Sequence, residues 1–192
     1  MSLVLIKEDG TGKVDANTYA TMEDGNAYFE GHLYPTPGWQ YFDFKLQSLV
    51  MATRLIDAFM QFNGFKAHND QALQWPRERC PDPDRLAGGW RVTGVGPAIV
   101  FGDEFIASNV VPKAIQDATC ELARELGIVD RTAAPPGEGL SSVTTGAGAS
   151  FSSTWYSKID TRHVLSRTTL AMLSKFGSPI GKGGGAVKLV RS

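Results

Sequence analysis

The sequence predicts a mainly α fold: a small helical bundle with a long β-hairpin excursion, a short N-terminal strand and an extended C-terminal tail. Three observations predict it. Apolar residues recur at helical spacing over residues 42–62 and 109–127. Gly, Pro, Ser and Thr dominate residues 133–157, where two β-prone runs flank a "GAG" turn. Glycines crowd residues 181–185, beyond the last helical pattern. We therefore expect one helical domain over residues 1–176 and a flexible arm over 177–192.

The N-terminal half carries clear start and stop signals. "LVLI" at residues 3–6, followed by "EDGTG", predicts a short strand and a turn. "TMED" is a capping-box pattern with Asp24 in place of Glu, and it predicts a helix from Thr21 to about His32. The next helix should end at "NG" (residues 63–64) and present one apolar face, made of Phe42, Leu46, Leu49, Thr53, Ile56 and Met60.

Residues 64–108 have no clear period, and we expect an irregular but ordered insertion there. It contains "LQWPR", which we interpret as a structural clasp made of Trp75, Pro76 and Arg77. Pro76 favours extended backbone before it, and Trp75 can bury a large face against the long helix. Arg77 can donate fixed hydrogen bonds to helix-end carbonyls or to a carboxylate.

The C-terminal half predicts two more helices and a hairpin arm. Pro112 is a helix-start signal, and Gly127 ends that helix. A last helix, capped by Asp160 or Thr161, should stop at Gly177. Because isolated hairpins are marginal in water, the arm (about 130–158) and the tail should contact other molecules. The side chains expected to make these contacts are Phe151, Trp155, Tyr156, Val187, Lys188, Leu189, Val190 and Arg191.

Composition argues against several classes of function. The formal net charge is −1, from 19 Lys and Arg against 20 Asp and Glu, so no basic stripe is expected. "GSPIGKG" departs from the phosphate-binding loop in spacing and in its last residue. No pattern of metal ligands or catalytic residues appears, and we expect no cofactor, no metal and no enzyme activity. No apolar run is long enough to cross a membrane, and the apolar run at residues 3–6 is too short for a signal peptide.

Three further interpretations of the insertion stay open at this point. Asp82 and Asp84, two residues apart, could serve acid–base chemistry or bind a cation, although a solvated turn is the simpler interpretation. Cys80, beside two arginines, could be a nucleophile with an acid partner. Trp75, Arg77, Arg79 and Arg85 could instead stack on bases and contact phosphates of single-stranded DNA.

The quoted motifs also occur together in a known family. "IKEDGTG", "ANTYATMEDGNAYF", "ATRLIDAF", "ALQWPRE" and "VPKAIQDATCELA" resemble a bacteriophage family often labelled DnaT-like single-stranded-DNA-binding protein, whose members are similar to head–tail connector (adaptor) proteins. The resemblance covers roughly residues 3–126. It implies a mostly helical fold, no catalysis, and a ring of about a dozen copies under the portal of a phage head.

From the resemblance we expect a structural virion protein. The ring would bind the portal protein, extend a channel that DNA passes without sequence-specific binding, and dock the tail or tail-completion proteins during virion assembly and DNA ejection. The expected location is the neck of the virion, after synthesis in the host bacterial cytoplasm. The alternative is a single-stranded-DNA-binding accessory protein of phage replication.

Overall fold

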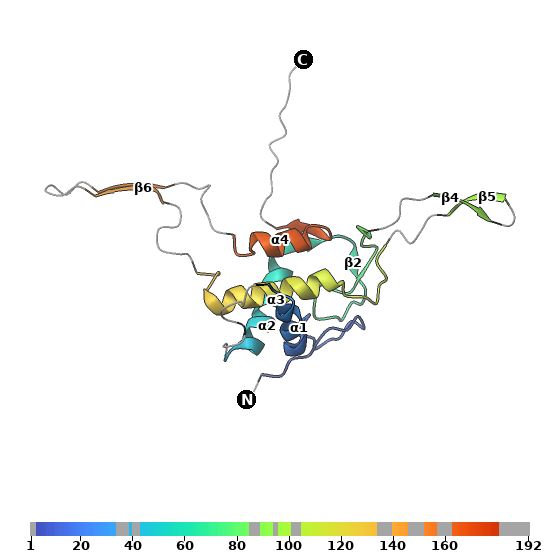
Figure 1. The fold of residues 1–192 in the computed structure, drawn as a ribbon, viewed down its shortest axis with the longest axis horizontal. Helices are drawn as coiled ribbons and strands as arrows, with labels where there is room; N and C mark the ends of the chain where they lie inside the picture. The colour runs from blue at the N-terminus through green and yellow to red at the C-terminus, as the bar shows by residue number, and fades with distance from the viewer. Residues whose placement is uncertain are drawn as a thin grey trace, which may run out of the picture.

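The computed structural model describes side chains for residues 3–33, 39, 43–84, 105–133 and 163–180, and the backbone alone for strands within 89–100, 140–145 and 152–156. The described residues form four helices around one core (Figure 1). The helices are α1 (Met22–Glu30), α2 (Lys45–Phe59), α3 (Lys113–Ile128) and α4 (Arg167–Leu173).

Eight short strands pair two by two, always antiparallel, within the described residues. Neighbours in sequence form the hairpin β4–β5 (Gly89–Thr93 and Gly96–Val100) and the hairpin β6–β7 (Leu140–Thr145 and Ser152–Tyr156). Distant segments form the other two pairs, which are β1 (Met60–Phe62) with β8 (Gly177–Pro179), and β2 (Phe65–Lys66) with β3 (Arg77–Glu78).

The prediction of a mainly α bundle is therefore wrong, because the chain is a small mixed α/β fold. The helix expected over residues 42–62 ends at Phe59, and Met60 takes extended backbone with φ −114° and ψ 131°. Met60 and Phe62 are buried while Gln61 is exposed, which is the alternation of a strand. Apolar residues at the end of the helical pattern thus serve a sheet, where β8 pairs with them.

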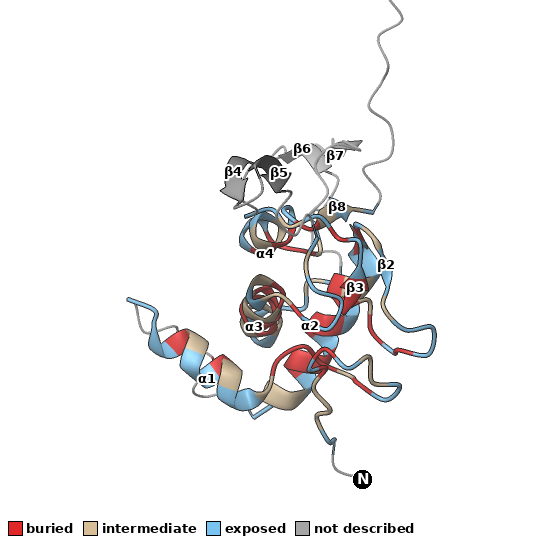
Figure 2. Cartoon of the chain, turned by 90° about the vertical axis from the view of Figure 1, so that its right-hand side faces the viewer, coloured by how far each residue is buried: buried red, intermediate tan, exposed pale blue. Residues whose placement is uncertain are grey.

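Helix α3 is central to the core. It packs against α1, α2 and α4, and Figure 2 shows buried residues on the facing sides of these elements. Leu49 and Ile56 of α2, Ile115 and Leu122 of α3, and Leu173 of α4 are completely buried. Each such side chain contributes about 1.5–3 kcal/mol by leaving water. This helical layer is the support on which the strand pairs β1–β8 and β2–β3 lie.

Local signals set several helix ends. The Thr21 capping box is confirmed, because the Thr21 hydroxyl accepts from Asp24 N–H and the Asp24 carboxylate accepts from Thr21 N–H. Pro112 is the N-cap residue of α3, so the helix begins one residue after this signal. Helix α4 begins at Arg167, and its cap is Ser166, whose hydroxyl accepts from Thr169 N–H.

Other expectations had different outcomes. The strand expected at residues 3–6 is absent from the described structure, where only an isolated bridge joins Lys7 and Thr18. The predicted caps Asp160 and Thr161 lie outside the described residues. The division into a domain over residues 1–176 and an arm over residues 177–192 stays a prediction. None of the described helices is long and apolar enough to cross a membrane.

Candidate nucleic-acid interface

Trp75 lies in the core. Its side chain is fully buried, and the Trp75–Pro76 peptide bond is cis. The ring packs edge-on against Phe62 of β1 and Phe176, with centroids 5.7 and 5.8 Å away. The indole thus packs against one ring from β1 and one ring directly before β8. Trp75 is not available to stack on a base, which rules out the sequence-based hypothesis that gave it this role.

Arg77 is also buried, with 6% of its surface exposed. Its guanidinium donates to the carbonyls of Phe62 at 3.3 Å, Asn63 at 2.7 Å and Gly64 at 2.7 Å. It also donates to the Gln74 carbonyl and side-chain oxygen, both at 3.0 Å. A guanidinium has five N–H donors in a planar fork, and here all five are used. Arg77 therefore fixes the turn after β1 to the segment before β3, and it does not reach a ligand.

Gly64 permits this close approach of two backbones. Its φ is +75°, a conformation that favours glycine. A Cβ at this position would lie 2.2 Å from the Glu78 carbonyl oxygen. The "NG" that the sequence marks as a helix stop is thus a turn between β1 and β2, with Asn63 and Gly64 presenting carbonyls to Arg77.

A buried tyrosine and a carboxylate fix the other end of the clasp. The Tyr19 hydroxyl donates to Asp57 Oδ1 at 2.5 Å and accepts from Trp75 N–H at 3.2 Å and Gln74 N–H at 3.1 Å. Asp57 Oδ2 accepts from Gln74 N–H at 3.0 Å. Burial raises the pKa of Asp57 to about 6 and holds the pKa of Tyr19 well above its ordinary value. The N-terminal segment, α2 and the clasp are therefore joined by one polar network.

The clasp holds a small two-stranded ribbon, β2–β3, at the surface. Phe65 of β2 is 68% exposed, and Lys66, Glu78 and Arg79 are exposed beside it. Lys66 Nζ donates to the Gln71 carbonyl at 3.2 Å, and no described carboxylate forms an ion pair with Lys66 or Arg79. We call Phe65, Lys66 and Arg79 the ribbon surface. An exposed aromatic ring on a short ribbon with exposed cations is a combination typical of surfaces that bind single-stranded nucleic acids.

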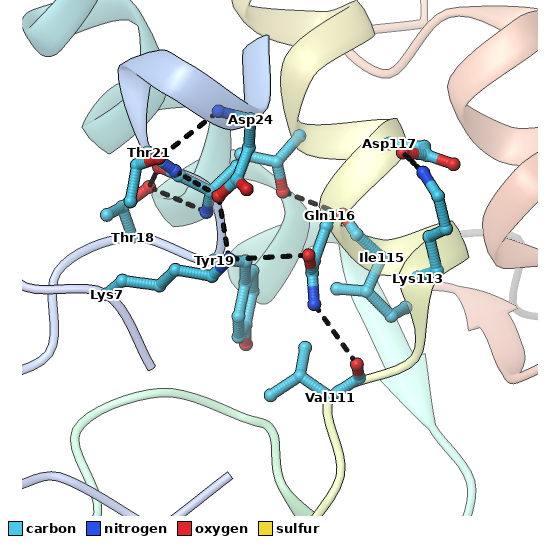
Figure 3. A network of polar contacts seen from close by, with 12 residues as sticks. Lys7, Thr18, Tyr19, Thr21, Asp24, Val111, Lys113, Ile115, Gln116 and Asp117 are labelled. Atoms are coloured by element: carbon cyan, nitrogen blue, oxygen red, sulfur yellow. Dashed lines mark hydrogen bonds and ion pairs between the residues drawn. The ribbon is translucent and has the colours of Figure 1, made fainter. Parts of the chain in front are cut away.

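Two lysines of the N-terminal segment, Lys7 and Lys13, are paired with carboxylates. Lys7 Nζ lies 2.7 Å from Asp24 Oδ2 and 3.5 Å from Gln116 Oε1, linking the N-terminal segment to α1 and α3 (Figure 3). Lys13 Nζ lies 2.8 Å from Asp9, which lowers the pKa of that carboxyl. Because these two lysines already form ion pairs, they are less available to a phosphate than Lys66 and Arg79 are.

The structure also shows the surroundings of Cys80, Asp82 and Asp84. Burial raises the pKa of the Cys80 thiol, which disfavours the thiolate that a nucleophile needs. Asp82 accepts from Asp84 N–H at 3.0 Å, as in a solvated turn. Within the described residues, no group of three metal-type ligands gathers. Phe151, Arg85 and residues 187–191 lie outside the described residues, and Trp155 and Tyr156 are on β7, of which only the backbone is described.

Part of the chain matches a known family. Residues 3–87 match the family model described as "Putative DnaT-like ssDNA binding protein". The matched region contains α1, α2, the clasp and the whole ribbon surface. Comparisons with curated proteins and with solved structures found no match.

The ribbon surface and the Tyr19–Asp57 pair escaped sequence reasoning for different physical reasons. Tyr19 and Asp57 are 38 positions apart, so no local pattern links them. Phe65 and Lys66 directly follow the "NG" turn, and exposed aromatic next to basic is a signal that could have been read there. Trp75 and Arg77 are also an aromatic and a basic residue, so the same signal predicts a contact at residues that are in fact buried.

Proposed function

We propose that the chain binds single-stranded DNA through the ribbon surface. The observation that carries the proposal is the match of residues 3–87 to a family model described as putative single-stranded-DNA-binding. Within that region Phe65, Lys66 and Arg79 are exposed, whereas Trp75 and Arg77 are enclosed. The proposed site thus consists of exposed residues of the segment whose buried residues form the clasp.

The chemistry of the ribbon surface is sequence-independent. Every base has a π face that can stack on Phe65, and such stacking contributes about 1–3 kcal/mol per base. Lys66 and Arg79 can contact phosphates on either side of a stacked base. Glu78, opposite Phe65 in the ribbon, reduces the local charge to two cations against one carboxylate. We therefore expect weak to moderate affinity with a small salt dependence.

Fluorescence anisotropy with a labelled oligothymidylate, titrated at two salt concentrations, tests this proposal. Phe65→Ala should weaken binding about 5- to 100-fold, the range that losing one stacked base implies. Lys66→Ala and Arg79→Ala should each reduce the slope of log K against log salt by about 0.7.

Two matched controls sharpen the test. Phe44→Ala removes a ring that is 66% exposed, against 68% for Phe65, and Arg167→Ala removes an exposed cation on α4. Both should bind as the parent chain does. Equal loss in Phe65→Ala and Phe44→Ala, or no binding by the parent chain at low salt, would remove the ribbon surface as the DNA site.

A second candidate function is the ring-forming head–tail connector of a phage virion, with the portal protein, tail proteins and further copies of this chain as partners. The two hairpins β4–β5 and β6–β7 favour it. In the described structure their strands pair only with each other, and such two-stranded units are marginal in water without a further contact. Exposed large apolar residues, including Leu33 and Phe44, add surface for neighbours to cover.

Assembly measurements separate the two functions. Light scattering of the purified chain, alone and with the portal protein, should give a closed ring if the connector proposal holds. Deleting the hairpin β6–β7 should then abolish the ring while leaving single-stranded-DNA binding unchanged. A chain that stays monomeric with the portal protein and binds oligothymidylate would leave only the first function.

A further inference from the structure

A groove lies at the start of α3, on surface that neither proposed function uses. Its volume is about 450 Å³, and residues from three segments line it: 82–84, 105–114 and Phe176. Phe105 and Val110, which line it, are 45% and 43% exposed. Large apolar side chains this open to water at a concave site indicate a binding surface for another apolar segment.

The charged residues that line the groove indicate what kind of ligand it would bind. Asp82 and Asp84 are among the residues that line it, and Asp84 is exposed. Lys113, which also lines it, is already paired with Asp117 at 2.6 Å. Asp84 has only a longer contact, to Lys175 at 3.4 Å, and no ion pair with Asp82 is present among the described residues. A ligand for this groove should therefore combine apolar side chains with positive charge.

The chain itself contains such a segment beyond its described part. Residues 181–192 read "GKGGGAVKLVRS", with three cations, no acid and four apolar residues at 186–190. Side chains alternate across an extended backbone, so Val187 and Leu189 would share one face. We propose that Ala186–Arg191 dock in the groove of the same chain, with Val187 and Leu189 against Phe105 and Val110, and Lys188 beside Asp82 and Asp84.

The connection is long enough for docking within one chain. Phe176 lines the groove, and the chain runs four residues beyond it to Ile180, about 13 Å in extended backbone. Gly181–Gly185 can return up to about 17 Å, and four of these five residues are glycine. A tether this short gives an effective concentration in the millimolar range, so a weak contact suffices for occupancy.

Zero-length cross-linking of the full chain with a carbodiimide tests the proposal. The reaction joins the Lys188 amine and the Asp82 or Asp84 carboxyl as an amide, and the carbodiimide takes up the water lost. We expect this link from Lys188 in preference to Lys182, which precedes the docked residues. Leu189→Asp should lower its yield by at least about tenfold, because a carboxylate is costly to bury in an apolar groove. The link between Lys175 and Asp84 should persist in this variant, which shows that the Asp84 carboxyl still reacts.

Isotope mixing identifies which copy supplies the tail. A mixture of ¹⁵N-labelled and unlabelled full chains should give links only within one isotope class. Links between classes would show that a second copy occupies the groove, and would overturn docking within the chain. Equal yields from Lys182 and Lys188, or a yield unchanged by Leu189→Asp, would also overturn it.

Discussion

Removing the Tyr19 hydroxyl gives the sharpest test of how the clasp is held. In Tyr19→Phe the ring keeps its place in the core, and only the oxygen is lost. That oxygen donates to Asp57 at 2.5 Å and accepts from the backbone N–H groups of Gln74 and Trp75. Gln74 N–H keeps its second acceptor, Asp57 Oδ2 at 3.0 Å. Trp75 N–H has no second acceptor among the described residues.

Two losses therefore set the magnitude. A hydrogen bond to a carboxylate contributes about 1.5–3 kcal/mol, and leaving a buried N–H unpaired costs about 1–3 kcal/mol. Together they predict that Tyr19→Phe lowers the free energy of unfolding by about 2.5–6 kcal/mol. With a urea m-value of about 2 kcal/mol/M, the unfolding midpoint should fall by about 1.3–3 M.

Urea denaturation followed by tryptophan fluorescence measures this change, because Trp75 lies beside the lost hydroxyl. Tyr28→Phe is the matched control. Tyr28 is half-buried against α3, and its hydroxyl makes no hydrogen bond in the described part of the chain. We expect less than about 0.5 kcal/mol from that change. If both variants unfolded at the same urea concentration, the network would not hold the clasp.

Three further variants test the same region. Arg77→Lys should lower the free energy of unfolding by about 2–4 kcal/mol in urea denaturation, because an ammonium cannot supply the fork that bonds four backbone carbonyls. Gly10→Ala should lower the free energy of unfolding by more than about 1 kcal/mol, because the φ of Gly10 is +102° and the new Cβ would lie 1.9 Å from the Asn109 carbonyl oxygen. Gly31→Ala is the control and should not lower it, because the nearest atom to its new Cβ is 3.5 Å away. The pKa of Asp57, about 6 when folded, exceeds its unfolded value, so the folded chain holds this proton more tightly. Between pH 4 and pH 6 its contribution to the free energy of unfolding should fall by up to about 2–3 kcal/mol, and urea midpoints of Asp57→Asn should lack that component.

Sequence signals located the elements whose stabilising contacts are local. The Thr21 capping box lies within four residues, so the start of α1 was predictable. Pro112 and the apolar face after it placed α3 to within a few residues. The strand β1 was missed because its partner β8 lies at the other end of the chain, and Met60 also fits the helical period of α2. Pairing across such a distance leaves no mark in a short window of sequence.

The site was harder to predict because buried and exposed residues of the same type alternate around the ribbon. Trp75 and Arg77 have the composition of a nucleic-acid contact, and so do Phe65 and Arg79. Composition cannot say which pair faces the solvent. Burial decides it, since it depends on how the 71–80 segment lies on Tyr19 and Asp57, which no local pattern contains.

This division between buried and exposed residues makes the two roles experimentally separable. Changes to Tyr19 or Arg77 remove bonds that hold the ribbon, so they should reduce stability and single-stranded-DNA binding together. Changes to Phe65 or Arg79 remove only exposed groups, so they should reduce binding while the urea midpoint stays within about 0.5 kcal/mol of the parent. The ratio of binding loss to stability loss then distinguishes a residue that contacts DNA from one that positions the contact. Arg77 and Arg79 are two residues apart and carry the same charge, so the pair Arg77→Ala and Arg79→Ala compares a buried, hydrogen-bonded arginine with an exposed one.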